Sequence, residues 1–296
     1  MPDAPATDRV GFVGLGRMGA PMVRRLAAGG VTVRGHDAAS GVAEGLADVL
    51  APVPRAAAAA EGSPVVILML PDSGVVEKVV DGGLLDALAP GALLVDMSTS
   101  EPLRTRALAE RVAGCGATLV DAPVSGGVAG AEAGTLTIMV GGPGDAVERL
   151  RPLLALMGRV RHVGGTGAGH AVKALNNLLS ASHLLATSEA ILAGERFGLN
   201  PTTMLDAING SSGRSGSTET KWPTHIVPGT YASGFTAGLM VKDLRIALGL
   251  AEAVDAPRGH AARTLALWSR AIDTLGPGAD HTEIARWLRE RPEEDQ

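Results

Sequence analysis

Residues 11–19, GFVGLGRMG, are the feature of this 296-residue sequence that most limits its fold. Gly14, Gly16 and Gly19 form the pattern GxGxxG between an apolar run, residues 10–13, and a segment whose apolar residues recur at helical spacing. In such a strand–turn–helix unit the first glycine permits the tight turn, the second admits a pyrophosphate close to the backbone, and the third allows close packing. The helix N-terminus then offers N–H groups to the phosphates. The stretch predicts a dinucleotide-binding unit.

Asp37 follows the second predicted strand, residues 31–33. A carboxylate at this place can accept hydrogen bonds from the adenosine ribose hydroxyls, and its charge would repel a 2′-phosphate. The next residue is Ala38 rather than an arginine, and Arg34 is badly placed for a 2′-phosphate. We therefore expect NAD as the cofactor, with NADP less favoured. A plain turn residue is the alternative interpretation of Asp37.

Short apolar runs alternate with helical segments through the first half of the chain. This alternation predicts an α/β Rossmann domain with a mostly parallel sheet covered by helices on both faces. The other strands expected are residues 65–70, 93–96, 118–120, 135–140 and 160–163.

The pattern changes after Gly169. Residues 170–198 contain no proline and only Gly194 interrupts them, which predicts one long helix. Further helices are expected at residues 201–209, 242–253 and 259–275, with no convincing strand among them. We therefore predict two domains, an NAD-binding Rossmann domain at residues 1–164 and an all-α substrate and oligomerisation domain at residues 165–296. Between these helices the Ser/Gly-rich residues 211–220 indicate a loop, and residues 291–296 a frayed acidic tail.

The composition narrows the class of protein. Hydrophobic residues make up 46% of the chain and aromatic residues 2%, so the core must be aliphatic. A net charge of -5 argues against a nucleic-acid partner, because a phosphate-binding surface usually leaves a basic excess. No apolar run approaches the ~20 residues of a membrane-spanning helix, and no secretory pattern opens the chain. The single cysteine, Cys115, is expected to be buried, and the protein to be cytoplasmic.

Residues 121–127, DAPVSGG, form the first of three further motifs. Pro123 restricts the backbone that leads into the loop. Ser125, Gly126 and Gly127 then offer a hydroxyl and successive backbone N–H groups that no side chain obstructs, a combination that suits a carboxylate. An ordinary flexible loop is the alternative.

Residues 165–177, GTGAGHAVKALNN, open the long predicted helix. Lys173 lies three residues before Asn176 and four before Asn177, so one helical face carries an ammonium beside two amides. Burial among alanine and leucine would depress the lysine pKa from its usual ~10.4, toward the range that a general acid or base needs. A surface lysine is the alternative.

Residues 235–248, FTAGLMVKDLRIAL, contain Lys242 and Asp243 within an apolar stripe. Taken alone, this pattern is typical of a solvated charge pair at a helix edge.

In this order, the motifs resemble those of the β-hydroxyacid dehydrogenase family, to which 3-hydroxyisobutyrate dehydrogenase belongs. The resemblance covers nearly the whole chain and includes Leu70, Pro71 and the stretch DMSTSEP at residues 96–102. It implies an N-terminal Rossmann domain, a long interdomain helix and an all-α C-terminal domain that commonly supports a homodimer or homotetramer.

The resemblance also implies roles for individual residues. Lys173 falls on the family's catalytic lysine and Asn177 on the asparagine that helps to place lysine and substrate. Ser125, Gly126 and Gly127 fall on the loop that binds the substrate carboxylate. No metal site is implied. The residues expected to bind the cofactor are Gly14, Gly16, Arg17, Met18, Gly19, Asp37, Leu70, Pro71, Thr99 and Lys242.

The implied function is that of an NAD-dependent oxidoreductase, which interconverts a small 3-hydroxy acid, such as 3-hydroxyisobutyrate, and its semialdehyde. Imine reductases share this architecture but usually lack the lysine, and related non-catalytic dinucleotide-binding modules tend to lose it as well. Lys173 and the intact DAPVSGG motif argue against both alternatives. The pocket that selects the acid is not predictable. Residues 212–221, with Arg214 as a cation for a second anion, could line it or form a surface loop.

Overall fold

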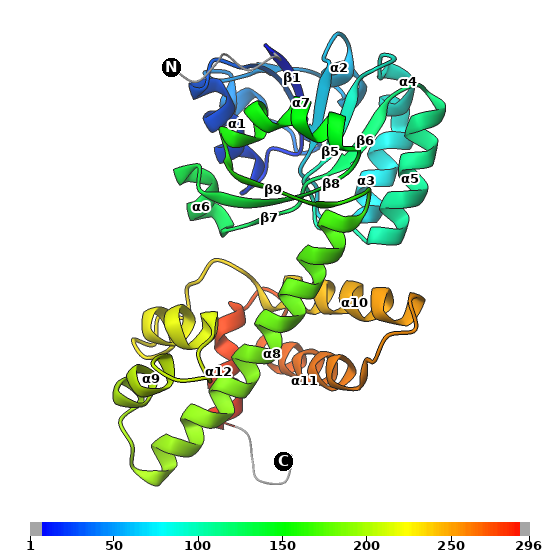
Figure 1. The fold of residues 1–296 in the computed structure, drawn as a ribbon. Coiled ribbons are helices and arrows are strands. Elements are labelled where there is room, and N and C mark those ends of the chain that lie inside the picture. Colours follow the sequence, from blue (N-terminus) through cyan, green and yellow to red (C-terminus); the bar gives the residue numbers. More distant parts are fainter. Residues whose placement is uncertain (1–7, 291–296) are drawn as a thin grey trace. The chain divides into compact units, whose positions relative to one another are not determined.

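The computed structural model describes residues 8–290 (Figure 1). The chain forms two compact units, Met1–Lys173 and Ala174–Gln296. The predicted acidic tail, residues 291–296, lies outside the described residues.

The first unit alternates strands with helices, as the sequence predicts. In chain order its elements are β1 (Arg9–Val13), α1 (Gly19–Ala28), β2 (Thr32–His36), η1 (Glu44–Leu46), β3 (Ala51–Pro52), α2 (Ala56–Ala60), β4 (Val65–Leu68), α3 (Ser73–Val79), η2 (Val80–Leu84), α4 (Leu85–Ala87), β5 (Leu93–Asp96), α5 (Pro102–Gly114), β6 (Thr118–Asp121), β7 (Val124–Ser125), α6 (Gly127–Ala133), β8 (Leu136–Gly141), α7 (Gly144–Ala155) and β9 (Gly158–Gly164).

These strands form one sheet in the order β3-β2-β1-β4-β5-β6-β8-β7, with β9 paired to β8. The pairs from β3 to β6 are parallel, in registers such as Val10 with Val65 and Val65 with Leu93. β8 runs antiparallel to β6 and β7 and parallel to β9. The prediction of a mostly parallel sheet is confirmed.

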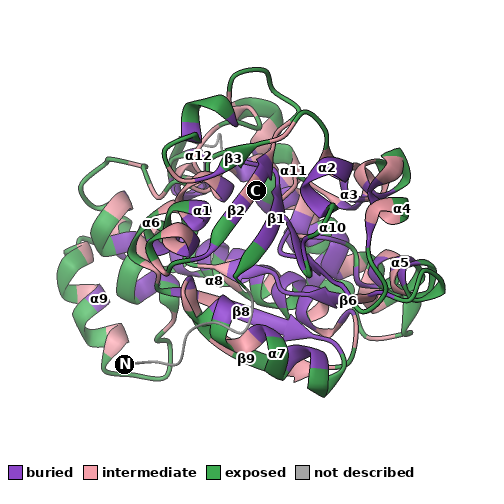
Figure 2. Ribbon diagram, turned by 90° about the horizontal axis from the view of Figure 1, so that it is seen from above, coloured by how far each residue is buried: buried purple, intermediate pink, exposed green. Residues whose placement is uncertain are grey.

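Alternate residues of the central strands enter two different cores, because side chains along a strand point to opposite faces. On β4, Val65 and Ile67 pack with residues of α1 and α7, whereas Val66 and Leu68 pack with residues of α2 and α5. All four residues are buried, as are those of β5, and the central strands are largely purple in Figure 2. Helices therefore cover the sheet on both faces.

The second unit is helical, and its core is made of aliphatic side chains around Trp222, Trp268 and Trp287. Among its described residues the β-type pairing is a single bridge, between Thr236 and Asp280. The elements are α8 (Ala168–Phe197), whose first turns belong to the first unit, followed by α9 (Pro201–Asn209), η3 (Ser217–Ile226), α10 (Ala237–Ala253), α11 (Gly259–Leu275), η4 (His281–Glu283) and α12 (Ile284–Glu290).

Two predictions about local structure are wrong. Residues 211–220 are not a loop throughout, since the π-helical segment η3 begins at Ser217. Thr218 bonds back to the Ser215 backbone, and burial of Trp222 and Ile226 stabilises the segment, which a Ser/Gly-rich pattern hides. Cys115 is exposed rather than buried, because it follows Val112, the last buried residue of α5. None of the helices within residues 8–290 has the length and hydropathy needed to cross a bilayer.

Candidate active site

The residues expected at the cofactor follow four neighbouring strands of the sheet. β2, β1, β4 and β5 are parallel neighbours, so their carboxyl ends lie at one edge. Gly14 follows β1, Asp37 follows β2, Leu70 follows β4 and Thr99 follows β5. The chain order reverses between β1 and β4, and ligands of open α/β sheets bind at such a switch point.

The glycine loop has the form that a pyrophosphate needs. Gly14 takes φ +96°, and a Cβ there would collide with the backbone oxygen of Met69. Gly16 is exposed, and nothing lies within 4 Å of the position a Cβ would take. The protein's own packing therefore does not require a glycine at position 16, whereas a phosphate approaching the backbone there would. Arg17 is exposed and Met18 half-buried at the start of α1, which begins at Gly19.

Asp37 holds this loop to the end of β2. Its Oδ2 accepts a hydrogen bond of 2.7 Å from Leu15 N, and its Oδ1 accepts one of 2.8 Å from Ala39 N. Arg34 donates instead to the backbone oxygen of Glu61 at 2.8 Å. The edge therefore presents a carboxylate where a ribose would lie, and these residues fit NAD.

Serine side chains fix the turns after β4 and β5. Leu70 N donates to Ser98 Oγ at 2.9 Å, and the buried Asp96 accepts bonds from Ser98 N and Ser100 Oγ. Thr99 is half-buried within this turn, and Pro71 is exposed next to Leu70. The two turns are thus connected at the same edge as the glycine loop.

Asp121 anchors the first turn of α8 to the end of β6. Its Oδ1 accepts a bond of 2.7 Å from Gly167 N, and its Oδ2 one of 2.9 Å from His170 N. Burial raises the pKa of Asp121, against the opposing effects of His170 and these two N–H groups. The fully buried His170 bonds in turn to Thr105 Oγ1 at 2.8 Å and to Ser98 O at 3.1 Å. The start of α8 is therefore tied to the turn after β5.

The DAPVSGG loop leads from β6 into α6. Ser125 ends β7, which pairs with β8, and its side chain is half-buried. Gly126 and Gly127 are exposed, with φ values of +130° and +63° that side chains rarely adopt. The loop thus exposes backbone next to a serine hydroxyl, as the motif predicts.

Lys173 and Asn177 occupy consecutive turns of α8, and both are buried, with exposures of 7% and 6%. The Asn177 Nδ2 group donates to Asp243 Oδ2 on α10 at 2.6 Å, and Asn177 Oδ1 accepts a bond from Asn176 Nδ2. Asp243 Oδ1 lies 3.5 Å from Lys242 Nζ. Asn177 of α8, one turn after Lys173, is therefore held by the Asp243 carboxylate of α10.

Two family models match the chain. The NAD binding domain of 6-phosphogluconate dehydrogenase matches residues 9–165, and the NAD-binding domain of NADP-dependent 3-hydroxyisobutyrate dehydrogenase matches residues 167–288. The 3-hydroxyisobutyrate dehydrogenase of Pseudomonas aeruginosa is 40% identical over 293 residues, which are 95% of this chain and 98% of that protein. The chain belongs to the β-hydroxyacid dehydrogenase family. It is an enzyme, an NAD-dependent oxidoreductase of hydroxy acids.

Other members of the β-hydroxyacid dehydrogenase family are similar over most of their length. The 2-(hydroxymethyl)glutarate dehydrogenase of Eubacterium barkeri is 43% identical over 81% of each chain. The solved 3-hydroxyisobutyrate dehydrogenase of Mycobacterium tuberculosis with L-serine is 33% identical, with a TM-score of 0.91 over 96% of this chain and 99% of that one. An imine reductase of Streptomyces aurantiacus, 21% identical with a TM-score of 0.61, shares the fold alone.

The sequence did not predict the environment of Asp243 in this dehydrogenase. A solvated pair was expected at Lys242 and Asp243, but Asp243 is 1% exposed and bonds to Asn177. The position of Asp243 within an apolar stripe is the sequence signal that could have indicated its burial. The parts played by Asp121 and His170 were also missed, although both lie within the quoted motifs.

Proposed function

We propose that this dehydrogenase interconverts a small 3-hydroxy acid and its semialdehyde, with Lys173 as the general acid and base. One observation carries the proposal: Lys173 is buried on α8, one turn before an Asn177 that Asp243 holds at 2.6 Å. A lysine is costly to bury without a role, because its charged form loses hydration.

Lys173 transfers the proton in both directions of the reaction. During oxidation its neutral amine removes the proton of the substrate hydroxyl, and during reduction its ammonium polarises the aldehyde and returns that proton. NAD, when bound, supplies the acceptor for the hydride that leaves the same carbon. We expect Gly14, Gly16, Arg17, Met18, Gly19, Asp37, Leu70, Pro71, Thr99 and Lys242 to hold it.

Ser125, Gly126 and Gly127 bind the substrate carboxylate in this proposal. The exposed backbone with positive φ and the adjacent hydroxyl support this role. Asn177 orients Lys173 and the substrate, since its side chain is fixed by Asp243 and Asn176. Both groups act through position, because a misplacement of about 1 Å can cost roughly a hundredfold in rate.

The test is to assay the enzyme with a panel of substrates. Turnover is measured by the absorbance of reduced nicotinamide, with NAD and separately with NADP as the cofactor. The panel contains 3-hydroxyisobutyrate, 3-hydroxypropionate, serine, glycerate, dihydroxypropanesulfonate and 2-(hydroxymethyl)glutarate. We expect NAD-linked oxidation of at least one 3-hydroxy acid. If every acid is inert while NAD binds, the proposed reaction is wrong.

We further propose a homodimer or homotetramer. Several large apolar side chains of α8 are exposed, among them Val172, Leu175 and Leu179 at 37%, 41% and 57%, and a second copy of the chain would bury them. Leu179→Glu should then lower the mass measured by light scattering, and an unchanged mass would contradict this interface.

A cytoplasmic location completes the proposal. Cys115 is a free and exposed thiol, which persists most readily in a reducing compartment. The excess of acidic residues, with a net charge of -5, favours a small-molecule substrate over nucleic acid as the partner.

A further inference from the structure

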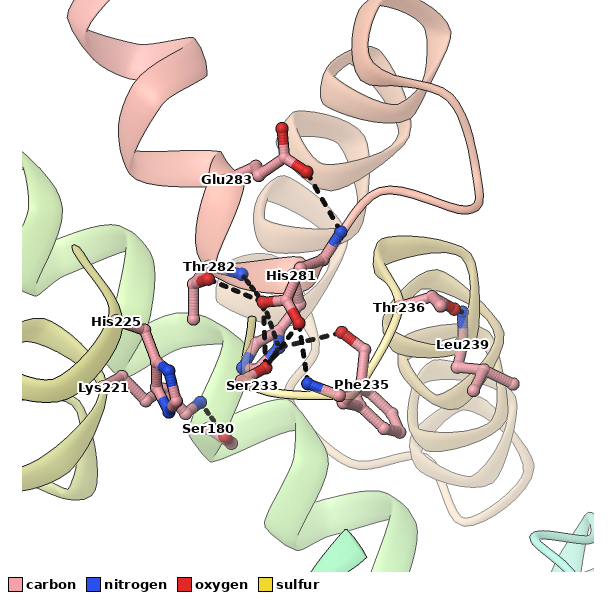
Figure 3. Close-up of polar contacts among 12 residues, drawn as sticks. Ser180, Lys221, His225, Ser233, Phe235, Thr236, Leu239, His281, Thr282 and Glu283 are labelled. Atoms are coloured by element: carbon pink, nitrogen blue, oxygen red, sulfur yellow. Dashed lines mark hydrogen bonds and ion pairs between the residues drawn. The ribbon is translucent and has the colours of Figure 1, made fainter. Parts of the chain in front are cut away.

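A cluster of polar residues in the helical unit surrounds Lys221 of η3 (Figure 3). The half-buried Lys221 donates a hydrogen bond of 2.7 Å from its Nζ to Ser180 Oγ of α8. Asp280, Ser233 and His281 form the other part of the cluster. None of these residues belongs to the site described above.

The Lys221 ammonium has no carboxylate partner at ion-pair distance within residues 8–290. Asp280 attracts it from farther away, but the Asp280 carboxylate already accepts bonds from Ser233 Oγ, Gly234 N and Thr282 N. Burial lowers the pKa of Lys221 to about 8, with Asp280 opposing the shift. A desolvated ammonium with one hydroxyl partner and spare N–H donors is a place where an anion would be stabilised.

The nearby imidazole of His281 carries no negative charge that could balance Lys221. His281 is buried, and burial together with the charge of Lys221 lowers its pKa to about 4, so its ring is neutral near pH 7. Figure 3 shows His225 beside Lys221 and Ser180. The field around Lys221 therefore favours a negative group.

Ser180 places this ammonium on the same helical face as the proposed catalytic residues. It lies seven residues after Lys173 and three after Asn177 on the continuous helix α8. Seven residues are nearly two turns, so Ser180 and Lys173 project within about 20° of each other and about 10 Å apart along the axis. Side chains of a helix lean toward its N-terminus, which directs Ser180 toward the turn of Asn177.

We propose that Lys221 and Ser180 bind a second carboxylate of the substrate, so that the enzyme prefers a dicarboxylic 3-hydroxy acid over a monocarboxylic one. This inference rests on the proposed function. Lys221 Nζ would donate a hydrogen bond to this carboxylate and balance its charge. The Ser180 hydroxyl accepts a hydrogen bond from Lys221 and would donate its own hydrogen to the same carboxylate. Arg214, the cation that the sequence offered for a second anion, lies 3.7 Å from Glu219 and is largely exposed.

The experiment compares 2-(hydroxymethyl)glutarate with 3-hydroxyisobutyrate as substrates. Both carry the same hydroxymethyl and carboxylate groups on one carbon, and the first adds a second carboxylate. The variants are Lys221→Met, which removes the charge and keeps much of the length, and Ser180→Ala. Lys78→Met, an exposed lysine of α3, is the matched control.

We expect the wild type to favour the dicarboxylic acid, and Lys221→Met to lower its kcat/KM by about tenfold to a hundredfold, mainly through KM. Ser180→Ala should do the same to a smaller degree. The kcat/KM for 3-hydroxyisobutyrate should stay within about twofold in both variants, and Lys78→Met should change neither substrate.

Three results would overturn the inference. A wild type that oxidises 3-hydroxyisobutyrate but not the dicarboxylic acid contradicts it and leaves the proposed function intact. So does an equal loss for both acids in Lys221→Met, because that result indicates a structural lysine. If neither these two acids nor any other of the panel is oxidised, the proposed function fails and the inference fails with it.

Discussion

Asp37 holds the glycine loop, and we propose that it also selects the cofactor. Its two oxygens accept the N–H groups of Leu15 and Ala39, so its position depends on the strand end and on the turn together. Each carboxylate oxygen still has acceptor capacity for a ribose hydroxyl. In our proposal, the residue that fixes the glycine loop also supplies the charge that disfavours a 2′-phosphate.

Asp37→Asn should relax the preference for NAD. The substitution keeps one acceptor oxygen but removes the charge and turns the other oxygen into a donor that faces an N–H group. We expect the ratio of kcat/KM with NAD to that with NADP to fall about tenfold or more. Asp48→Asn, at an exposed ion pair with Arg24, is the control. An unchanged ratio would show that Asp37 has only a structural part.

At the residue scale, the sequence predicted the environment only of residues whose neighbours are close along the chain. Lys173 and Asn177 are four residues apart on one helix, and both are buried as expected. Asp243 and Lys221 were not recognised, because their partners Asn177 and Ser180 lie 66 and 41 residues away. Their environments come from helix packing, which a single sequence does not display.

At the scale of elements, α8 depends on how its first turn meets the sheet. A Cβ on Gly169 would collide with the backbone oxygen of Met139 and lie 2.8 Å from Asp121 Oδ2. The helix that carries Lys173 can therefore approach β8 and Asp121 only because residue 169 is glycine.

Gly169→Ala should lower both stability and activity. A backbone oxygen cannot give way as a flexible side chain does, so the first turn of α8 must shift. We expect a loss of about 1–3 kcal/mol in the free energy of unfolding by urea and a lower kcat. Gly165→Ala is the matched control, because nothing lies within 4 Å of its Cβ position. Equal behaviour of the two variants would contradict this account of the helix start.

The elements themselves followed from apolar periodicity. The predicted strands 93–96, 118–120 and 135–140 differ from the observed ones by at most one residue at either end. β3 and β7 were missed because two-residue strands carry no periodic signal. The helix η3 was missed because tertiary burial of Trp222 and Ile226, rather than local propensity, stabilises it.

At the scale of the whole molecule, a buried histidine links stability to pH. His281 bonds to Phe235 O at 3.1 Å, and burial followed by Lys221 lowers its pKa from 6.5 to about 4. The unfolded chain therefore binds a proton between these values that the folded chain does not. Stability is full above pH 6.5 and falls as the pH drops toward 4.

This linkage predicts a loss of about 2 kcal/mol of unfolding free energy between pH 7 and pH 5 that depends on His281. The measurement is urea unfolding at both pH values for the wild type and for His281→Asn, whose amide can still donate to Phe235 O. The variant should lose less stability than the wild type on acidification. An identical loss would assign the effect to other groups.

The proposed role of Lys173 as general acid and base can be tested by measuring turnover and NAD binding together in Lys173→Ala. We expect kcat for the best acid of the panel to fall by about a hundredfold to ten-thousandfold. The dissociation constant of NAD should stay within about twofold of the wild-type value, because the proposal assigns Lys173 to the substrate proton and not to the cofactor. A loss of NAD affinity comparable to that of Gly16→Asp, or turnover that persists without the lysine, would contradict it.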